Sequence, residues 1–418
     1  MVDQLDISGL AGLELYVGYG TTEEDMRTSP GKLAKIYSVP ASASPSPSNV
    51  VPLVVDSGPP GLQVSDMNMP FISVTVCAPG GNGNCQTIDH IQVDTGSTGL
   101  RLLSGVVSAS LSLPTQRSAS GAPVAECVQF ADGSAVWGPV RLADVRIAGE
   151  QAASVPIQII GDPAFTTIPR ACSGLPINTV QTFGANGIIG LGHFREDCGA
   201  YCADNLANGQ YYSCPSTGCA NATMPRAQQV ANPVALFAND NNGIVIQLPA
   251  ISDAGEAGVT GSLILGIGTR SNNALGAAKV LPVDPYYGML TTVYRGVSYI
   301  DSVIDSGSTA LFLPSTSSLP ACSRRDPFAA GFLCPSTTQS LSATNRGTNG
   351  ATDTVNFNVA NASALLQNTQ ISAFNNIAAL NSDPHGLTWG LPFFYGRTVF
   401  TAIENANTPG GAGPYVAY

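Results

Sequence analysis

The sequence predicts an all-β protein built from two related halves. Short runs rich in β-branched and aromatic residues recur along its 418 residues, with turn clusters between them. Glycine (45) and proline (30) are abundant, and charged residues make up 11% of the chain, against about 25% in an ordinary globular protein. A ten-residue pattern built around Asp occurs once in each half. These features favour strands over helices, and the length suits two or three domains.

The apolar runs place the expected strands in order. In the first half they are residues 71–77, 87–93, 100–103, 124–130, 136–147 and 155–160. In the second half they are residues 244–248, 262–266, 279–283, 289–294, 297–304 and 311–314, with strand character again over 391–403. Helical spacing of Ala, Leu and Ile predicts one or two helices within 361–380, and a short helix is expected at 231–239. The Cys-rich residues 198–224 lack periodicity, which predicts a surface segment held by disulfides.

The chain ahead of these strands has a different character. Two strand-like runs, 13–18 and 32–39, predict a β-hairpin, which is marginally stable alone. The first residues are acidic and lack the apolar core of a signal peptide, and no run of about 18 apolar residues predicts a membrane span. The expected parts are a hairpin fragment (1–40), a Ser/Pro linker (41–49), an N-terminal lobe (50–240) and a C-terminal lobe (241–418).

The ten cysteines predict disulfide bonds formed in an oxidising compartment. Their spacing does not match a zinc site, so no metal is expected. The expected pairs are Cys77–Cys85, Cys322–Cys334 and Cys127–Cys172. The remaining four are expected to pair among themselves, in an order that the sequence leaves open: Cys198, Cys202, Cys214 and Cys219. We therefore expect a secreted, periplasmic or cell-surface protein.

Residues 91–100 and 302–311 share one pattern. Each runs from apolar residues into Asp, then a hydroxyl residue, Gly and two more hydroxyl residues, before apolar residues return. The two aspartates, Asp94 and Asp305, stand 211 positions apart. A strand that ends in Asp and turns on Gly presents a carboxylate at a loop tip. A third Asp-Ser-Gly, at 56–58, continues into Pro and Gly and predicts only a turn.

A second element repeats after each Asp pattern. Residues 188–190 (Ile-Ile-Gly) and 388–390 (Thr-Trp-Gly) are expected to pass beneath the Asp loops, where Gly lets two backbones approach closely. Such an internal duplication predicts two similar lobes with a cleft between them. One carboxylate from each lobe would then meet the other at the cleft floor. Two adjacent carboxylates cannot both ionise readily, so the pair would share a proton and titrate as a unit.

With these residues in view, the chain resembles the pepsin-like aspartic peptidases. The resemblance rests on residues 93–98 (Val-Asp-Thr-Gly-Ser-Thr), 304–309 (Ile-Asp-Ser-Gly-Ser-Thr) and 186–192 (Asn-Gly-Ile-Ile-Gly-Leu-Gly), and runs from about residue 50 to the C-terminus. The sequence of residues 85–101 and 391–404 further resembles an uncharacterised bacterial branch of domain-of-unknown-function proteins with pepsin-like motifs.

The resemblance implies a bilobal pepsin-like acid protease fold and an aspartic endopeptidase that works at acidic pH without metal or cofactor. Asp94 and Asp305 would activate a water molecule between them. The resemblance also assigns supporting roles. Thr95 and Ser306 would cross-link the two loops. Gly96 and Gly307 would donate backbone N–H groups to the carboxylates. Ser97 and Ser308 would hydrogen-bond the outer carboxylate oxygens. The implied partner is an extended polypeptide. We expect a monomer, and the net charge of −11 predicts no nucleic-acid binding.

Two positions depart from the family pattern. The family's hairpin flap carries a Tyr that hydrogen-bonds a Trp shortly after the first Asp loop, and here Phe130 and Arg101 stand at those positions. Phe can cover a substrate but has no hydroxyl. The flap-like stretch also includes Gly133, and nearby Trp137 is a third candidate for substrate binding. We interpret Arg101 as a structural ion pair rather than a ligand for a substrate carboxylate.

Other functions remain as alternatives. The main alternative is a non-catalytic pepsin-like binding or surface protein, because a fold does not guarantee activity. A weaker one is an acidic secreted inhibitor or a carbohydrate-binding module. His90, His193 and His385 are scattered and do not predict a Ser-His-Asp site. Retention of both carboxylates and their hydroxyl neighbours favours the peptidase.

Overall fold

A computed structural model describes residues 14–18, 33–38, 49–63, 66–80 and 83–418. The chain forms two compact units, Met1–Ser48 and Asn49–Tyr418. In the first, strands β1 (Glu14–Gly18) and β2 (Leu33–Ser38) pair antiparallel, which is the expected hairpin. Residues 41–48 of the expected linker lie outside the described residues.

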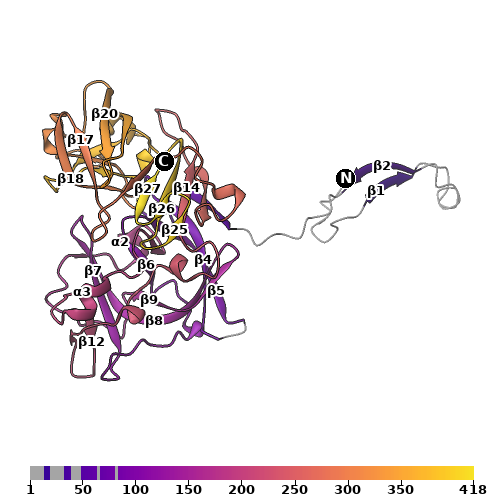
Figure 1. The fold of residues 1–418 in the computed structure, drawn as a ribbon, viewed down its shortest axis with the longest axis vertical. Helices are drawn as coiled ribbons and strands as arrows, with labels where there is room; N and C mark the ends of the chain where they lie inside the picture. Colours follow the sequence, from indigo (N-terminus) through magenta and orange to yellow (C-terminus); the bar gives the residue numbers. More distant parts are fainter. Residues whose placement is uncertain (1–13, 19–32, 39–48, 64–65, 81–82) are drawn as a thin grey trace. The chain divides into compact units, whose positions relative to one another are not determined.

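The second unit is predominantly β-strand, so the predicted all-β class is confirmed. Its described residues form one sheet of sixteen strands and one of seven (Figure 1). The large sheet runs in the order β13 (Ala220–Asn221), β12 (Tyr211–Ser213), β7 (Val124–Gln129), β8 (Ser134–Ile147), β9 (Glu150–Ile160), β6 (Thr98–Leu103), β11 (Gly187–Leu191), β5 (Cys85–Asp94), β4 (Pro70–Cys77), β3 (Val50–Val55), β15 (Val259–Leu265), β14 (Gly243–Leu248), β24 (Arg397–Ala402), β27 (Tyr415–Ala417) and β16 (Val280–Pro282), with β10 (Leu175–Pro176) beside β8.

The seven-stranded sheet belongs to the second half of the sequence. Its order is β21 (Thr352–Val359), β20 (Gln339–Arg346), β17 (Leu290–Tyr294), β18 (Val297–Ile304), β23 (Thr388–Trp389), β19 (Leu311–Leu313) and β22 (Ala378–Leu380). A separate pair is β25 (Asn407–Thr408) and β26 (Gly411–Ala412). In Figure 1, β17, β18 and β20 lie at the top of the view, β7, β8 and β12 at the bottom, and β14 and β27 between them.

The helices of the described residues are short. The α-helices are α2 (Val180–Phe183), α3 (Gly199–Asp204) and α4 (Ala362–Leu365). The 3-10 helices are η2 (Ala109–Leu111), η3 (Arg226–Gln228), η4 (Pro233–Leu236), η5 (Ser271–Asn273), η6 (Ser315–Ser317) and η7 (Leu391–Phe393). No helix in this part of the chain is long and apolar enough to cross a membrane.

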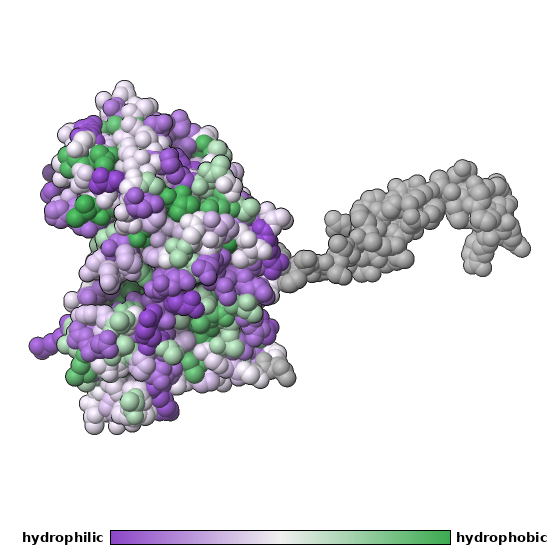
Figure 2. All heavy atoms as spheres, viewed as in Figure 1, coloured by the Kyte–Doolittle hydropathy of each residue, from purple (hydrophilic) through white to green (hydrophobic). Residues whose placement is uncertain are grey.

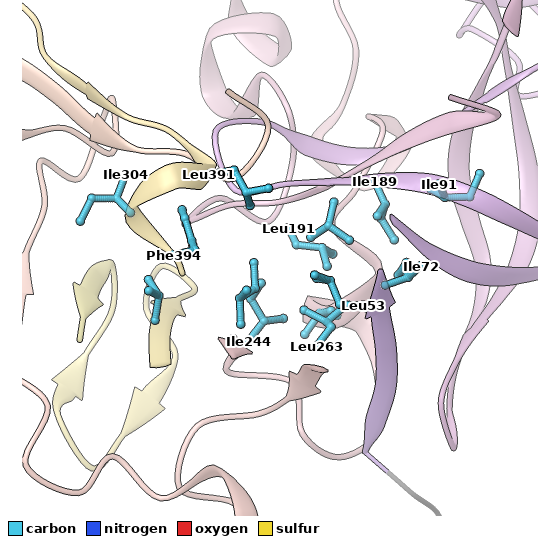
Figure 3. Packing of buried hydrophobic residues seen from close by; sticks show 14 of the residues in the cluster. Leu53, Ile72, Ile91, Ile189, Leu191, Ile244, Leu263, Ile304, Leu391 and Phe394 are labelled. Atoms are coloured by element: carbon cyan, nitrogen blue, oxygen red, sulfur yellow. The ribbon is translucent and has the colours of Figure 1, made fainter. Parts of the chain in front are cut away.

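The large sheet and its core join the two halves of the sequence. Strand β3 of the first half pairs antiparallel with β15 of the second, with Leu53 opposite Gly261. Buried residues of both halves then pack in one cluster, shown in Figure 3. Leu53, Ile91 and Ile189 come from the first half, and Ile244 comes from the second. Each fully buried side chain of this size contributes about 1.5–3 kcal/mol, so this shared core holds the halves together.

Three further predictions can be compared with the structure. The one or two helices expected within 361–380 are represented by α4, while Ala378–Leu380, at the end of that range, pairs with β19 as strand β22. Pairing to a neighbouring strand there outweighs helical spacing. The short helix expected at 231–239 is the 3-10 helix η4. Residues 198–224, expected as a surface segment closed by disulfides, contain two disulfides, and their strand β12 also extends the large sheet by pairing with β7.

The disulfide predictions are confirmed. All ten cysteines lie in the described residues, and none is free. The bonds are Cys77–Cys85, Cys127–Cys172, Cys198–Cys202, Cys214–Cys219 and Cys322–Cys334. The face shown in Figure 2 mixes hydrophilic and hydrophobic residues rather than presenting one kind alone.

Candidate active site

The two Asp patterns fold as matching loops. Strand β5 ends at Asp94 and β6 leaves the loop at Thr98. Strand β18 ends at Ile304, directly before Asp305, and β19 leaves at Leu311. In each loop the aspartate therefore stands at the end of a strand, where a sharp turn on glycine directs the chain back into the sheet.

A third strand supports each loop from beside it. Strand β11 lies parallel to β5 and antiparallel to β6, with Gly190 opposite Asp94 and Gly99. Strand β23 lies between β18 and β19 in the same manner. A Cβ atom at Gly390 would lie 2.5 Å from the carbonyl oxygen of Ser308, closer than real contacts allow. The elements expected beneath the loops are thus found there, and glycine permits the approach.

The structure brings the two carboxyl groups together. A Cβ atom at Gly96 would lie 2.8 Å from Cγ of Asp305, and a Cβ atom at Gly307 would lie 2.5 Å from Oδ1 of Asp94. Each carboxyl group therefore lies against the glycine of the opposite loop. Asp94 is buried and Asp305 is partly exposed.

The surroundings of Asp94 favour its protonated form. Burial raises the pKa of Asp94 well above its ordinary value, and both the charge of Asp305 and a hydrogen bond between the two carboxyl groups raise it further. The hydroxyl of Ser97 and the backbone N–H of Gly96 act in the opposite direction on this pKa, because they stabilise the carboxylate. One carboxyl group of such a pair stays protonated while the other is ionised.

Each carboxyl group accepts hydrogen bonds from equivalent donors of its own loop. The N–H of Gly96 donates to Oδ1 of Asp94 at 2.7 Å, and the N–H of Gly307 donates to Oδ1 of Asp305 at 2.8 Å. The hydroxyl of Ser97 donates to Oδ2 of Asp94, and that of Ser308 donates to Oδ2 of Asp305 at 2.7 Å. This arrangement fixes the orientation of both carboxyl groups, and Gly96 beside them is exposed to solvent.

Thr95 and Ser306 tie the loops to each other. The N–H of Ser306 donates to Oγ1 of Thr95 at 2.9 Å, and the N–H of Thr95 donates to Oγ of Ser306 at 3.1 Å. Each hydroxyl then donates to a carbonyl across the junction, Thr95 to Ile304 and Ser306 to Val93. Both side chains are buried, where a lost partner costs about 1–3 kcal/mol. The loops therefore hold a fixed spacing.

Two residues that no sequence pattern singled out also support the site. Gln92 donates from Nε2 to the carbonyl of Gly307 at 3.1 Å, which adds a third link between the loops. Asn68 is fully buried at φ 50 and donates to the carbonyls of Thr309 and Phe374. Asn is among the few residues that tolerate positive φ, but the sequence around Asn68 gives no sign of its distant partners.

The three flap candidates divide between two places. The turn of the β7–β8 hairpin contains Phe130 and Gly133, and Phe130 packs on an apolar cluster with Leu103 and Ile188 of the strands that hold the Asp94 loop. Trp137 belongs to a different cluster, where its Nε1 donates to the carbonyl of Phe165 at 2.8 Å. The cluster of Phe130 is thus the one adjoining the Asp94 loop.

Arg101 is buried in ion pairs, as interpreted from the sequence. Its Nη2 lies 2.9 Å from Oε1 of Glu126 and 2.7 Å from Oδ2 of Asp197. The side chain is 2% exposed, so it does not face a ligand from solvent. In the described part of the chain, no group of three or more His, Cys, Asp or Glu residues is arranged to hold a metal ion.

Comparison with known proteins gives a family whose description states no function. The profile of the family described as "Protein of unknown function (DUF3443)" matches residues 45–418. A search of curated proteins found no match to this chain. Because the profile covers far more than half of the sequence, the chain belongs to the DUF3443 family.

Proposed function

We propose that this protein is an aspartic-type endopeptidase that hydrolyses peptide bonds with a water molecule activated by Asp94 and Asp305. The observation that carries the proposal is the meeting of two carboxyl groups from matching loops, and the raised pKa of Asp94 is consistent with a proton shared by the pair. A buried carboxyl pair with a shared proton supplies an acid and a base at one point. The repeated β5–β11–β6 and β18–β23–β19 arrangements further support a bilobal pepsin-like fold, with lobes at 50–240 and 241–418 and the pair at the floor of a cleft.

The reaction follows from this shared proton. The ionised carboxylate accepts a proton from a water molecule as its oxygen attacks the peptide carbonyl carbon. The protonated carboxyl group donates to the carbonyl oxygen, which stabilises the tetrahedral intermediate. When the C–N bond breaks, the amine nitrogen takes the proton that the first carboxyl group accepted from water. A hydroxyl of the intermediate returns a proton to the second carboxylate, and the other product leaves as a carboxylic acid. Ser97, Ser308 and the N–H groups of Gly96 and Gly307 keep both carboxyl groups oriented throughout.

The proposal extends to location and partner. Five disulfides fit a protein that folds in an oxidising compartment, so we place it outside the cytosol, as a secreted, periplasmic or cell-surface enzyme. Its substrate is an extended polypeptide, because a scissile bond must reach both carboxyl groups with its backbone exposed. We propose that Phe130 covers the bound segment from the β7–β8 hairpin.

The second candidate is a non-catalytic binding or surface protein of the same fold. Phe130 offers no hydroxyl to a partner, and Arg101 directs its guanidinium into buried ion pairs instead of toward the hairpin tip. A peptide could then bind in the cleft without being cleaved. The two candidates differ in one observable, the appearance of new peptide ends.

Cleavage of a denatured protein tests the proposal. We expect the protein to cleave denatured haemoglobin or casein at pH 3–5 and to lose this activity with a statyl-type inhibitor. The rate should fall as the pH rises, because the raised pKa of Asp94 marks where the pair loses its proton. New N-termini counted across pH 3–8 measure this. No cleavage at any pH would favour the binding protein, and a rate that is flat from pH 4 to 8 would contradict the acidic optimum.

A further inference from the structure

A second buried group of charges lies behind the β7–β8 hairpin. We call it the Arg101 cluster, and its members are Arg101, Glu126, Asp197 and Tyr211. Their ion pairs and hydrogen bonds are short: Arg101 Nη2 contacts both carboxylates, and the hydroxyl of Tyr211 donates to Oδ1 of Asp197 at 2.7 Å. The side chain of Glu126 is 0% exposed and that of Asp197 is 4% exposed. The charges therefore interact with little screening by solvent.

The cluster has more negative than positive groups. One guanidinium faces two carboxylates, and no further cation is among the groups that contact them in the described residues. Burial raises the pKa of Asp197 well above its ordinary value, and the adjacent Glu126 raises it further, against the opposing effects of Arg101 and Tyr211. Protonation of Asp197 would reduce the excess of negative charge around Arg101.

Each member comes from a different element around the proposed active site. Arg101 lies on β6 and its Nη1 donates to the carbonyl of Thr98, within the Asp94 pattern, at 2.6 Å. Glu126 lies on β7, the first strand of the hairpin that carries Phe130. Asp197 follows β11, and Tyr211 lies opposite Glu126 on β12. One guanidinium thus joins the Asp94 loop, the hairpin and the segment after β11.

We propose that the Arg101 cluster is a positioning site that holds the β7–β8 hairpin in a fixed place over the Asp94 loop. The proposal rests on the proposed function for its consequence, which is alignment of a bound peptide with the carboxyl pair. Stability alone does not explain the cluster, because apolar residues of similar volume commonly replace buried ion pairs without loss. A guanidinium is suited to the task, since its planar fork donates to several oxygens in set directions and an ammonium group does not.

The Arg101→Lys variant tests this positioning. It keeps the positive charge but cannot reach three acceptors on three elements. We expect kcat to fall at least tenfold at pH 4 with little change in KM. Amides at the hairpin turn, such as Gly133, should lose protection from hydrogen exchange about tenfold. Arg141→Lys, in a half-buried ion pair on β8, is the matched control and should change each quantity less than twofold. The turn at Gly350 of the β20–β21 hairpin is the internal control for exchange.

The two readouts separate this proposal from the peptidase proposal. One outcome is that the wild-type protein cleaves no substrate while the Arg101→Lys substitution still loosens the β7–β8 hairpin selectively. In that case the positioning proposal is supported and the peptidase proposal is wrong. If Arg101→Lys leaves both activity and exchange at the level of Arg141→Lys, the positioning proposal is wrong.

Glu126→Gln gives a second variant should Arg101→Lys not fold. Gln keeps an acceptor for Arg101 and leaves one carboxylate facing one guanidinium, so Asp197 no longer needs a proton to balance the charge. In the wild type, protection of the hairpin turn should decline as the pH rises past the loss of that proton, after correction for intrinsic exchange. In Glu126→Gln it should stay constant from pH 5 to 9. The same decline in both proteins would overturn the role of the cluster.

Discussion

Replacing either Asp94 or Asp305 with Asn is expected to lower kcat/KM roughly 10³-fold or more at pH 4. Each carboxyl group has a separate task, one accepting a proton from water and the other donating to the carbonyl oxygen, so neither can act alone. Asn retains the size of the side chain and an acceptor for the N–H of Gly96 or Gly307. The loss should therefore appear in kcat rather than in folding. Initial rates on one denatured substrate measure it.

Asp301→Asn is the matched control for this loss. Asp301 lies in β18, four residues before Asp305, and none of the hydrogen bonds to the carboxyl pair comes from its side chain. Its variant should retain activity within a factor of two. Equal activity of the wild type, Asp94→Asn and Asp305→Asn would show that any cleavage arises elsewhere in the protein or from a contaminant.

The free energy of unfolding is expected to fall as the pH rises from 4 to 7. Burial raises the pKa of Asp94 and Asp197 well above 3.8, and burial together with the charge of Asp56 raises that of Asp66 to about 7. The unfolded chain releases these protons near pH 4, whereas the folded protein retains them to higher pH. The contribution of these protons to the free energy of unfolding is therefore fully present below the ordinary pKa, and it is lost as the pH rises through the pKa of the folded protein. Each retained proton contributes up to about 1.4 kcal/mol per pH unit.

Urea unfolding at half-unit pH steps measures this slope. Asp94→Asn should flatten it, and should be more stable than the wild type at pH 7, because an amide carries no charge to bury. Two lowered pKa values act in the opposite sense. Burial lowers the pKa of His193, so the unfolded chain binds a proton near pH 6.5 that the folded protein does not, but the three retained protons outweigh this one. The lowered pKa of Asp326 acts below pH 4, outside this window. A protein that gains stability from pH 4 to 7 would contradict the retained protons.

The strands were the most predictable part of this fold. Runs such as 297–304 alternate or concentrate apolar residues between turn residues, and the structure has β18 over the same span. Within 361–380, the spacing of Ala and Leu predicted the helix that forms as α4 but not strand β22, because Ala378–Leu380 gains a hydrogen-bonded partner in β19. Local spacing contains no information about such a partner 67 positions away.

The carboxyl pair could be anticipated because its two halves repeat one pattern, so each aspartate identifies the other. The supports of the site carry no such signal. Asn68 reaches Thr309 across 241 positions, and Arg101 reaches Asp197 across 96. Buried polar contacts of this kind depend on the completed fold, since either residue alone reads as an ordinary loop or strand residue. The excess of carboxylates around Arg101 could not be predicted either, because Glu126 and Asp197 reach Arg101 only in the completed fold.

The most direct test of the paired carboxyl groups is the binding of a statyl-type inhibitor, measured by calorimetry from pH 4 to 8. The inhibitor presents a hydroxyl where the attacking water would stand, so it should detect a paired, singly protonated Asp94 and Asp305 even if turnover is slow. We expect one inhibitor per chain, tight binding at pH 4 that weakens as the pair loses its proton, and at least a hundredfold loss of affinity in Asp94→Asn and Asp305→Asn. Absence of binding at every pH, or binding that neither substitution changes, would contradict the account.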